Sequence, residues 1–276
     1  MVVVSNRQHP IVKRCRALAL AREAPAVLLD GEHLVADALA AGVTLEAVLT
    51  DERPREVTSI ADARGVPRYE GTRAVLAAAS PVRTTSGIVA IARWTPAPLD
   101  ILLGSASPLI VALVDVQDPG NVGSVIRTSE ALGASGVMAL GETADPGGWK
   151  ALRGAMGSTF RLPVARGTVS EALAGARARG CRVAATVATG GDGIDLAALG
   201  GPLLLMLGNE GAGLDRDVID AADVRLSIPM AATVNSLNVS VTAALCLWEA
   251  RRQRFGARGQ RLKAQDPSTQ DPGLQD

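Results

Sequence analysis

Apolar residues along the chain fall into short continuous runs, and these runs alternate with amphipathic stretches. Runs such as LLLML, which starts at residue 203, contain no polar residue, as is typical of parallel strands buried on both faces of a sheet. In the second half of the chain we predict strands at 109–116, 136–140, 181–188, 203–207 and 224–228. Helical spacing predicts helices between and after them, at about 122–132, 169–179, 214–221 and 236–254.

The first half alternates in the same way with shorter elements. It predicts strands at 26–29, 45–49, 66–69 and 87–93, and helices at 5–24, 32–41, 54–64 and 72–79. Residues 94–107 contain two prolines and one glycine and have no clean period. We therefore predict an α/β protein with a small α/β domain at 1–93, a linker at 94–107, a parallel-sheet domain at 108–255 and a disordered tail at 256–276.

Amino-acid composition adds little to this prediction of the fold. The 276 residues are 47% hydrophobic and carry a formal net charge of zero, so overall charge does not indicate a nucleic-acid partner. Residues 1–22 are an exception, because they hold five cations and no acid. The three scattered cysteines fit a reducing compartment, and with only two histidines we expect no metal site. Without a signal pattern or a membrane-length apolar run, we expect a cytoplasmic protein.

Residues 227–253 carry the most informative pattern. A strand ends at Pro229, a polar turn follows, and the string Asn235-Ser236-Leu237-Asn238 opens a long apolar helix. Asn235 and Ser236 are both good helix N-caps, and the free N–H groups of a helix start suit an anion or a polar cofactor. The simpler alternative is that Ser236 only caps the helix and Asn238 only occupies its first turn.

Two upstream loops also follow predicted strands. In the first, Pro119-Gly120 makes a turn, Asn121 can cap a helix, and Gly123 allows close packing. Arg127 lies six residues after Asn121, nearly two turns, so the two side chains need not point the same way. In the second, the run GNEGAG at 208–213 permits positive φ angles and close backbone approach to a ligand, and it contains Glu210. Parallel strands end at one edge of a sheet, so these loops are expected to form a site together.

Together the three segments resemble the SpoU (TrmH-type) RNA 2′-O-ribose methyltransferases of the SPOUT class. The resemblance covers about residues 108–253. Its matching residues are Asp118, Pro119, Asn121, Gly123 and Arg127; Gly208, Asn209, Glu210, Gly211 and Gly213; and Ile228, Pro229, Met230, Ser236, Leu237, Asn238, Val239, Ser240 and Val241. The chain departs from the family at Ala231-Ala232-Thr233, where a glycine is usual, and at Asn235, where an acid is common.

The resemblance implies a deep C-terminal trefoil knot, S-adenosylmethionine as cofactor, a homodimer that uses helix 236–254, and methylation of a ribose 2′-hydroxyl. By family position, the residues expected at the catalytic centre are Asn121, Arg127, Glu210, Ser236 and Asn238. Those expected to hold the cofactor are Leu207, Gly208, Ile228, Met230 and Leu237. Because a guanidinium keeps its proton at neutral pH, we expect Arg127 to bind phosphate and stabilise the developing oxyanion rather than act as a base.

The first domain resembles, more weakly, the kink-turn-binding domain of ribosomal-protein type that many of these enzymes carry, through Leu28 to Val35. RNA contacts are expected at Arg7, Lys13, Arg14 and Arg127. The separate domain favours 23S rRNA as substrate over tRNA. Two other classes stay open: a dinucleotide-dependent oxidoreductase, although G-x-G-x-x-G is missing, and an RNA-binding protein without catalysis.

Overall fold

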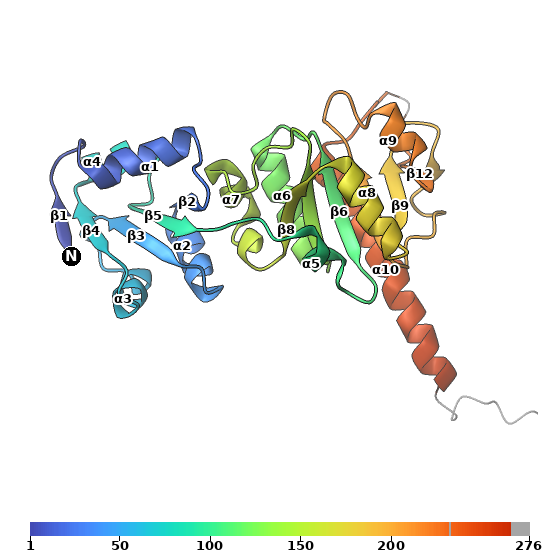
Figure 1. Cartoon of the computed structure of the whole chain (residues 1–276), viewed down its shortest axis with the longest axis horizontal. Coiled ribbons are helices and arrows are strands. Elements are labelled where there is room, and N and C mark those ends of the chain that lie inside the picture. Colours follow the sequence, from blue (N-terminus) through green and yellow to red (C-terminus); the bar gives the residue numbers. More distant parts are fainter. Residues whose placement is uncertain (232, 266–276) are drawn as a thin grey trace, which may run out of the picture.

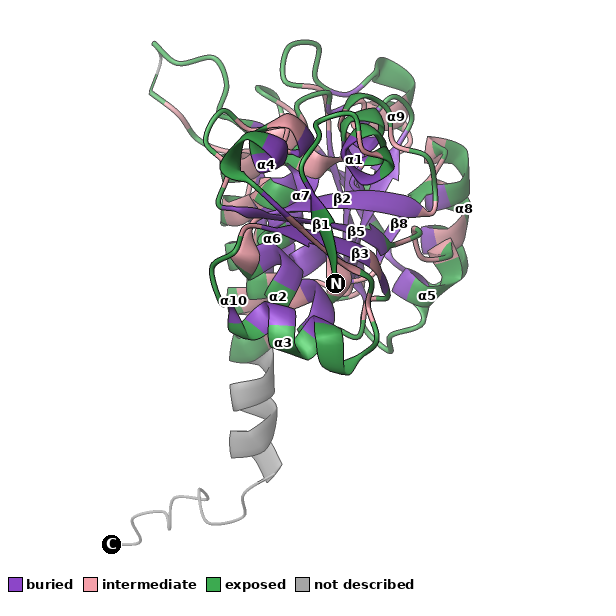
Figure 2. Ribbon diagram, turned by 90° about the vertical axis from the view of Figure 1, so that its left-hand side faces the viewer, coloured by how far each residue is buried: buried purple, intermediate pink, exposed green. Residues whose placement is uncertain are grey.

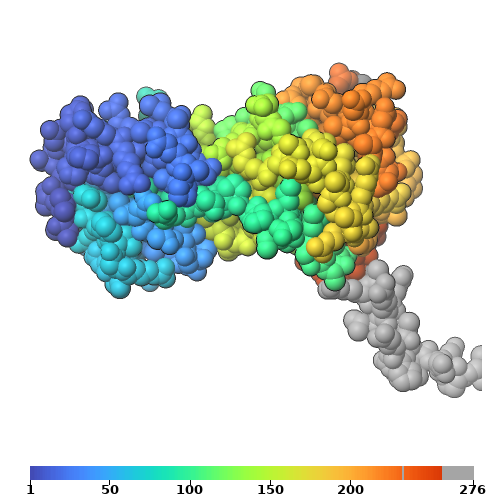
Figure 3. Space-filling view, in the orientation of Figure 1, coloured from blue at the N-terminus to red at the C-terminus, as the bar shows by residue number. Residues whose placement is uncertain are grey.

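The computed structural model describes the backbone of residues 1–231 and 233–265 and the side chains of this part as far as residue 256. The chain forms two lobes around two sheets (Figure 1, Figure 3). We call residues 1–93 the first lobe and residues 99–265 the second lobe. In the part of the chain that the structure describes, no helix has both the length and the apolar character needed to cross a membrane.

The first lobe is a five-stranded sheet between two pairs of helices. Its elements are β1 (Val2–Val4), α1 (Pro10–Leu20), β2 (Ala26–Asp30), α2 (Glu32–Ala40), β3 (Leu45–Thr50), α3 (Glu56–Ala63), β4 (Arg68–Gly71), α4 (Arg73–Ala79) and β5 (Ile88–Arg93). The strand order is β1-β4-β3-β5-β2; β1, β4 and β3 run parallel, and β5 runs antiparallel to β3 and β2. Helices α1 and α4 share one apolar core with the sheet, and α2 and α3 share the other.

The second lobe is a seven-stranded, all-parallel sheet covered on both faces. Its elements are α5 (Leu99–Leu103), β6 (Leu109–Val114), α6 (Pro119–Ala131), β7 (Gly136–Leu140), α7 (Trp149–Ala155), the 3₁₀ turn η1 (Ser158–Phe160), β8 (Val164–Gly167), α8 (Val169–Ala178), β9 (Arg182–Thr186), β10 (Asp192–Gly193), β11 (Leu203–Leu207), α9 (Arg216–Asp220), β12 (Val224–Ser227) and α10 (Val239–Gln265). The order is β10-β12-β9-β11-β6-β7-β8. Helices α6, α7 and α10 pack on one face, and α5, α8 and α9 on the other (Figure 2).

The predicted fully apolar strands are the centre of this sheet. Every residue of β6 and β11 is buried, because helices cover both faces and the pair lies in the interior of the strand order. The sequence pattern missed β1, β8 and β10 and helices α5 and α7. These elements have only two to seven residues, too few to show a period. The predicted linker at 94–107 therefore contains the helix α5.

The last helix differs from prediction at both ends. It begins at Val239 instead of residue 236, and it continues to Gln265, past residue 256, where the predicted tail begins. The added stretch GARGQRLKAQ is rich in good helix formers, which outweigh its two glycines. The remainder of the predicted disordered tail, 266–276, lies outside the described residues.

The two lobes meet at α7. Leu152 of α7 is fully buried in the core that α2 and α3 share, and Trp149 packs against the core under α1 and α4. On its other side α7 lies against α6, where a Cβ on Gly123 would come within 2.2 Å of the Ala151 carbonyl oxygen. Only glycine allows the two helix backbones to approach this closely. Helix α6 is therefore connected to the first lobe through α7.

Candidate active site

Three loops that are far apart in the sequence meet at the carboxyl edge of the large sheet. They follow β6, β11 and β12, and a chain of hydrogen bonds joins them. The Asn238 side-chain nitrogen donates to the Asn121 side-chain oxygen at 2.9 Å, and the Asn121 nitrogen donates to a Glu210 carboxylate oxygen at 2.9 Å. We call these three residues the amide relay. The structure thus brings one predicted catalytic residue from each loop into direct contact.

Neighbouring groups fix both ends of the amide relay. The Asn238 oxygen accepts hydrogen bonds from the Ser240 backbone N–H at 2.8 Å and from the Ser240 hydroxyl at 2.6 Å. The second Glu210 oxygen lies 3.4 Å from the Gln117 backbone nitrogen, which donates to it. Because the amide groups are bonded on both sides, their orientation is set by the network.

Asn238 caps the last helix, and this corrects the prediction for Ser236. A capping side chain accepts from the N–H of the second or third helical residue, and Asn238 does so with Ser240, the second residue of α10. Asn235 and Ser236 precede the cap and line a cavity instead. Two good capping residues in a row misled the sequence prediction, because only hydrogen-bond geometry distinguishes between them.

Asn209 shapes the glycine loop, a role that the sequence prediction missed. Its side-chain nitrogen donates to the Asp115 carbonyl at 2.9 Å, and its oxygen accepts from the N–H groups of Gly211 and Ala212 at 2.8 and 3.0 Å. Asp115 itself adopts φ +55°, a strained conformation for a non-glycine residue. The ends of β6 and β11 are therefore locked together at the site. The signal in the sequence was an asparagine two residues after a buried strand.

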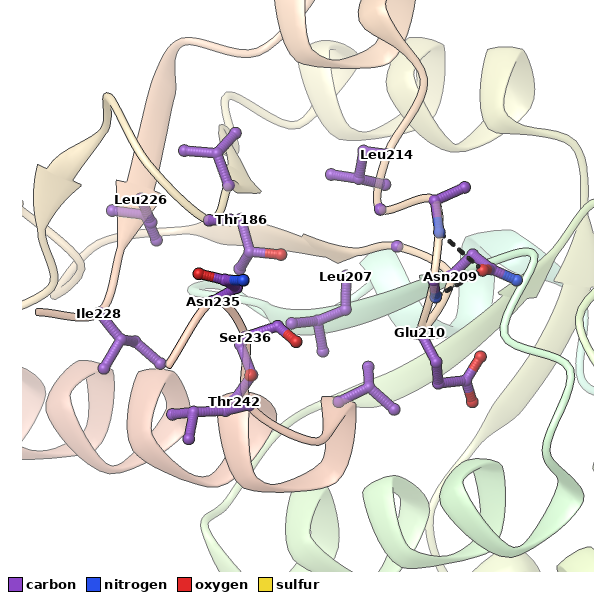
Figure 4. Close-up of a pocket in the computed structure, with 18 of the residues that line it drawn as sticks. Thr186, Leu207, Asn209, Glu210, Leu214, Leu226, Ile228, Asn235, Ser236 and Thr242 are labelled. Atoms are coloured by element: carbon purple, nitrogen blue, oxygen red, sulfur yellow. Dashed lines mark hydrogen bonds between the residues drawn. The ribbon is translucent and has the colours of Figure 1, made fainter. Parts of the chain in front are cut away.

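A cavity of about 380 Å³ lies beside the amide relay (Figure 4). All five residues predicted to hold the cofactor line it: Leu207, Gly208, Ile228, Met230 and Leu237. Glu210 and Ser236 line it as well. Sequence reasoning missed further lining residues from β9 and α10, among them Thr186, Thr242 and Cys246. Their signal is weak, because each is a single small residue inside a regular element.

The charge of this cavity favours a cationic or neutral ligand. Glu210 is the acidic residue of its lining, and no lysine, arginine or histidine is among the described lining residues. Burial raises the pKa of the Cys246 thiol to about 12, so this cysteine stays protonated and is no nucleophile. Most of the lining is apolar or glycine backbone, which suits a partly apolar molecule held by main-chain groups.

Arg127 is not brought into this arrangement. It lies on α6, is exposed, and has no hydrogen bond or ion pair among the described residues. Six helical residues rotate a side chain by about 240°, so Arg127 and Asn121 leave α6 in directions about 120° apart. As the helical spacing allows, the two side chains differ in direction: Asn121 joins the amide relay and Arg127 is exposed to solvent.

The remaining predicted RNA contacts lie in the first lobe, remote in sequence and structure from the cavity. Arg7, Lys13 and Arg14 are exposed before or on α1, and Arg14 forms an ion pair with Glu46. A second cavity, of about 640 Å³, also lies in this lobe. Its lining includes Glu52, Arg53, Glu70 and Arg73 and none of the predicted catalytic or cofactor residues.

Comparisons with known proteins agree with the geometry. Residues 108–248 match the model of the SpoU rRNA Methylase family. A 23S rRNA (guanosine(2553)-2′-O)-methyltransferase of Bacillus subtilis is 32% identical over 228 residues, which cover 81% of this chain and 88% of that protein. A tRNA/rRNA methyltransferase of uncharacterised function from Mycobacterium tuberculosis H37Rv is 34% identical over 275 residues, with 94% and 85% coverage.

Solved structures give the same result over both lobes. An rRNA methyltransferase from Sinorhizobium meliloti with bound AdoMet superimposes with a TM-score of 0.83 at 33% identity, covering 91% of this chain and 97% of that one. The SpoU methyltransferase AviRb from Streptomyces viridochromogenes, in complex with AdoMet, gives 0.80 at 28% identity, with 90% and 100% coverage. The predicted family is confirmed, and the oxidoreductase and non-enzyme alternatives are excluded. The chain is an S-adenosylmethionine-dependent RNA methyltransferase and belongs to the SpoU rRNA methylase family.

Proposed function

We propose that this enzyme methylates a ribose 2′-hydroxyl of 23S rRNA. The amide relay carries the proposal, because it assembles three predicted catalytic residues from three loops at the edge of the cavity. The Bacillus subtilis relative, whose name specifies a 2′-O-methyl transfer to 23S rRNA, supports this substrate. An enzyme that modifies ribosomal RNA would work in the cytoplasm.

The residues present fit S-adenosylmethionine. When bound, this cofactor supplies an electrophilic methyl group on a positively charged sulfur. Main-chain groups at Gly208, Ile228 and Leu237 would hold its polar edges, and Leu207 and Met230 would contact its apolar parts. The carboxylate of Glu210 supplies the negative charge that a sulfonium favours.

The amide relay would position the acceptor nucleotide. Asn121 and Asn238 are neutral, so they hydrogen-bond a ribose without drawing a proton from it. Ser236 lines the cavity and is exposed, so its hydroxyl can donate to the same nucleotide or accept from it. Their contribution is alignment, since a displacement needs the attacking oxygen in line with the methyl group.

Arg127 would contact the RNA backbone. It is exposed and unpaired among the described residues, as a phosphate-binding arginine requires before RNA arrives. A guanidinium that holds the neighbouring phosphate also stabilises the negative charge that develops on the ribose oxygen. The proton then leaves to phosphate or water.

Methyl transfer from labelled S-adenosylmethionine tests this function. The wild-type enzyme should label 23S rRNA from cells that lack this gene, and Arg127→Ala should lose turnover while binding the cofactor normally. Arg179→Ala, an exposed arginine at the end of α8, is the matched control and should keep full activity. Label in tRNA alone would favour the tRNA alternative; unchanged turnover of Arg127→Ala would overturn the role of Arg127.

We also propose a homodimer and a deep trefoil knot in the second lobe. Val241, Leu245 and Trp248 follow each other at helical spacing on α10 and are 46%, 38% and 60% exposed. An apolar stripe of this kind is typical of a helix that packs against a partner. For the knot, the support is membership of the family together with the site itself, in which two loops separated by α9 and β12 line one cavity, the first through Gly208 and Gly213 and the second through Ile228 and Leu237. Light scattering should give twice the monomer mass for wild type and a monomer for Trp248→Glu.

The two lobes would then have separate tasks, with residues 1–93 binding substrate and residues 108–255 performing the transfer. The first lobe has its own sheet and two apolar cores, to which α7 of the second lobe adds Leu152 and Trp149, and this supports the division.

A further inference from the structure

Charge is divided between the two faces of the first lobe. Helix α1 carries Lys13, Arg14 and Arg16, helix α4 begins with Arg73, and neither helix contains an acid. The opposite helices show the reverse: α2 and α3 contain four carboxylates and no lysine or arginine, namely Glu32, Asp37, Glu56 and Asp62. The lobe has a basic face, formed by α1 and α4, and an acidic face, formed by α2 and α3.

The cations of the basic face are free to bind a ligand. Lys13, Arg16 and Arg73 are exposed, and among the described residues none of them has a hydrogen bond or an ion pair with a carboxylate. Only Arg14 is engaged, by Glu46. On the acidic face the arginines are used internally: Arg55 is buried among Asp51 and Glu32, and Arg64 donates to the Leu39 carbonyl at 2.8 Å.

The basic face lies on the same side of the molecule as the cofactor cavity. In both Figure 1 and Figure 2, α1 and α4 lie on the upper side, as does α9, which contributes Ile219 to the cavity lining. Helices α2 and α3 lie on the lower side in both views. An extended polyanion could follow the upper side from the first lobe to the site without crossing the acidic face.

Helix α7 continues this surface between the lobes. In Figure 1 it lies between α1 and α6. Trp149, at its start, packs against the core under α1 and α4, and the next residue, Lys150, is exposed with its ammonium 5.6 Å from the Trp149 ring centre. The contact holds the lysine at the junction while leaving its charge available to solvent.

We infer that the substrate RNA docks on the basic face, with its backbone on α1 and α4 and across Lys150 of α7, and that the acidic face points away from it. The inference rests on the proposed function and specifies where that RNA lies. Phosphates are the complementary charge for these lysines and arginines, and like-charge repulsion keeps them off α2 and α3.

RNA binding as a function of salt concentration tests the inference without methyl transfer. The probes are transcribed 23S rRNA and tRNA with the full-length protein. If each cation contacts one phosphate, the triple variant Lys13→Gln/Arg16→Gln/Arg73→Gln should lower the slope of log K against log salt by about three. Arg73→Gln alone should lower it by about one, whereas the matched control Arg64→Gln, one arginine on the opposite face, should leave it unchanged. An unchanged slope in the triple variant would overturn the inference.

Directed cleavage gives a second readout that retains every charge. Ala17→Cys on α1 and Ala63→Cys on α3 are exposed sites for an iron–EDTA label, and the native cysteines are buried. RNA should be cut from position 17 and left intact from position 63. Equal cutting from both, or cutting from 63 alone, would contradict the inference. Absence of binding to either RNA would instead count against the proposed function.

Discussion

A methyl group added at Gly208 should disrupt the cofactor site. The Cβ of Gly208→Ala would lie 2.2 Å from the Gly213 carbonyl carbon and 2.4 Å from the Leu214 nitrogen. Both are backbone atoms and cannot rotate away. Ordinary contact begins at 3.4 Å, so the loop has to open by about 1 Å. The loop is closed on itself, because Asn209 and Gly213 exchange two backbone hydrogen bonds of 3.0 and 3.1 Å.

The cost of this clash should be about 1–3 kcal/mol, the usual range for overpacking. It has to appear in one of two quantities. If the loop stays closed, the free energy of unfolding falls, and a 1 kcal/mol loss lowers Tm by about 2–4 °C in a chain of this size. If the loop relaxes by opening, cofactor binding has to close it again, and Kd for S-adenosylmethionine rises by about 5- to 150-fold.

Titration calorimetry with S-adenosylmethionine and a thermal melt together measure both quantities. The matched control is Gly211→Ala in the same loop, whose Cβ would meet only the Asn209 side-chain oxygen, at 3.5 Å. It should change Kd by less than about twofold, since ordinary contacts cost little. If Gly208→Ala alters neither Kd nor Tm, the closed loop described above is not the one that binds the cofactor.

Three further changes test a helix cap at the site, the contact between α6 and α7, and an ion pair of the first lobe. Asn238→Ala should lower the unfolding free energy by about 1 kcal/mol, because the helix cap is lost, and should also lower turnover. Asn238→Asp keeps the cap but loses the donor to Asn121, so a melt should show restored stability while methyl transfer stays low. Gly123→Ala should lower the unfolding free energy by about 1–3 kcal/mol in denaturant titrations, since its Cβ would meet the Ala151 carbonyl at 2.2 Å. Partial burial would raise the pKa of Asp51, but hydrogen bonds from Arg55 and Arg53 outweigh it and lower this pKa to about 2. Asp51 therefore contributes up to about 2 kcal/mol above pH 4, lost as pH falls towards 2, and urea titrations of Asp51→Asn should not show this loss.

The central architecture could be predicted because burial on both faces removes polar residues from a strand. The runs at 109–114 and 203–207 are apolar throughout, and they are neighbours at the middle of the large sheet. Edge elements leave no such signal. Strand β10 has two residues, and β8 includes an arginine and a glycine, so their pairing depends on neighbours that the local sequence does not specify.

The composition of the site was predictable, but its hydrogen bonding was not. Glycines and asparagines after buried strands indicated which loops matter, and all five predicted cofactor residues line one cavity. Which asparagine faces which partner depends on distances between loops, as Asn209 and Asn238 show. Arg127 shows the same limit of the sequence. Helical spacing gave its direction relative to Asn121, but only the fold showed that a side chain in this direction is exposed to solvent.

The amide relay also bears on how the reaction proceeds. A site that used a side-chain base would need a group poised to lose and gain a proton near neutral pH, and histidine is the usual choice. Both histidines of this chain lie in the first lobe, and the thiol that lines the cavity has a pKa of about 12. Asn121 and Asn238 are neutral amides that cannot take the proton, so they serve alignment, and the Glu210 carboxylate is engaged by hydrogen bonds from Asn121 and from the Gln117 N–H. Catalysis should therefore depend on the geometry of three loops, and variants that shift a loop without removing a polar group, such as Gly208→Ala, should reduce turnover as severely as loss of an amide.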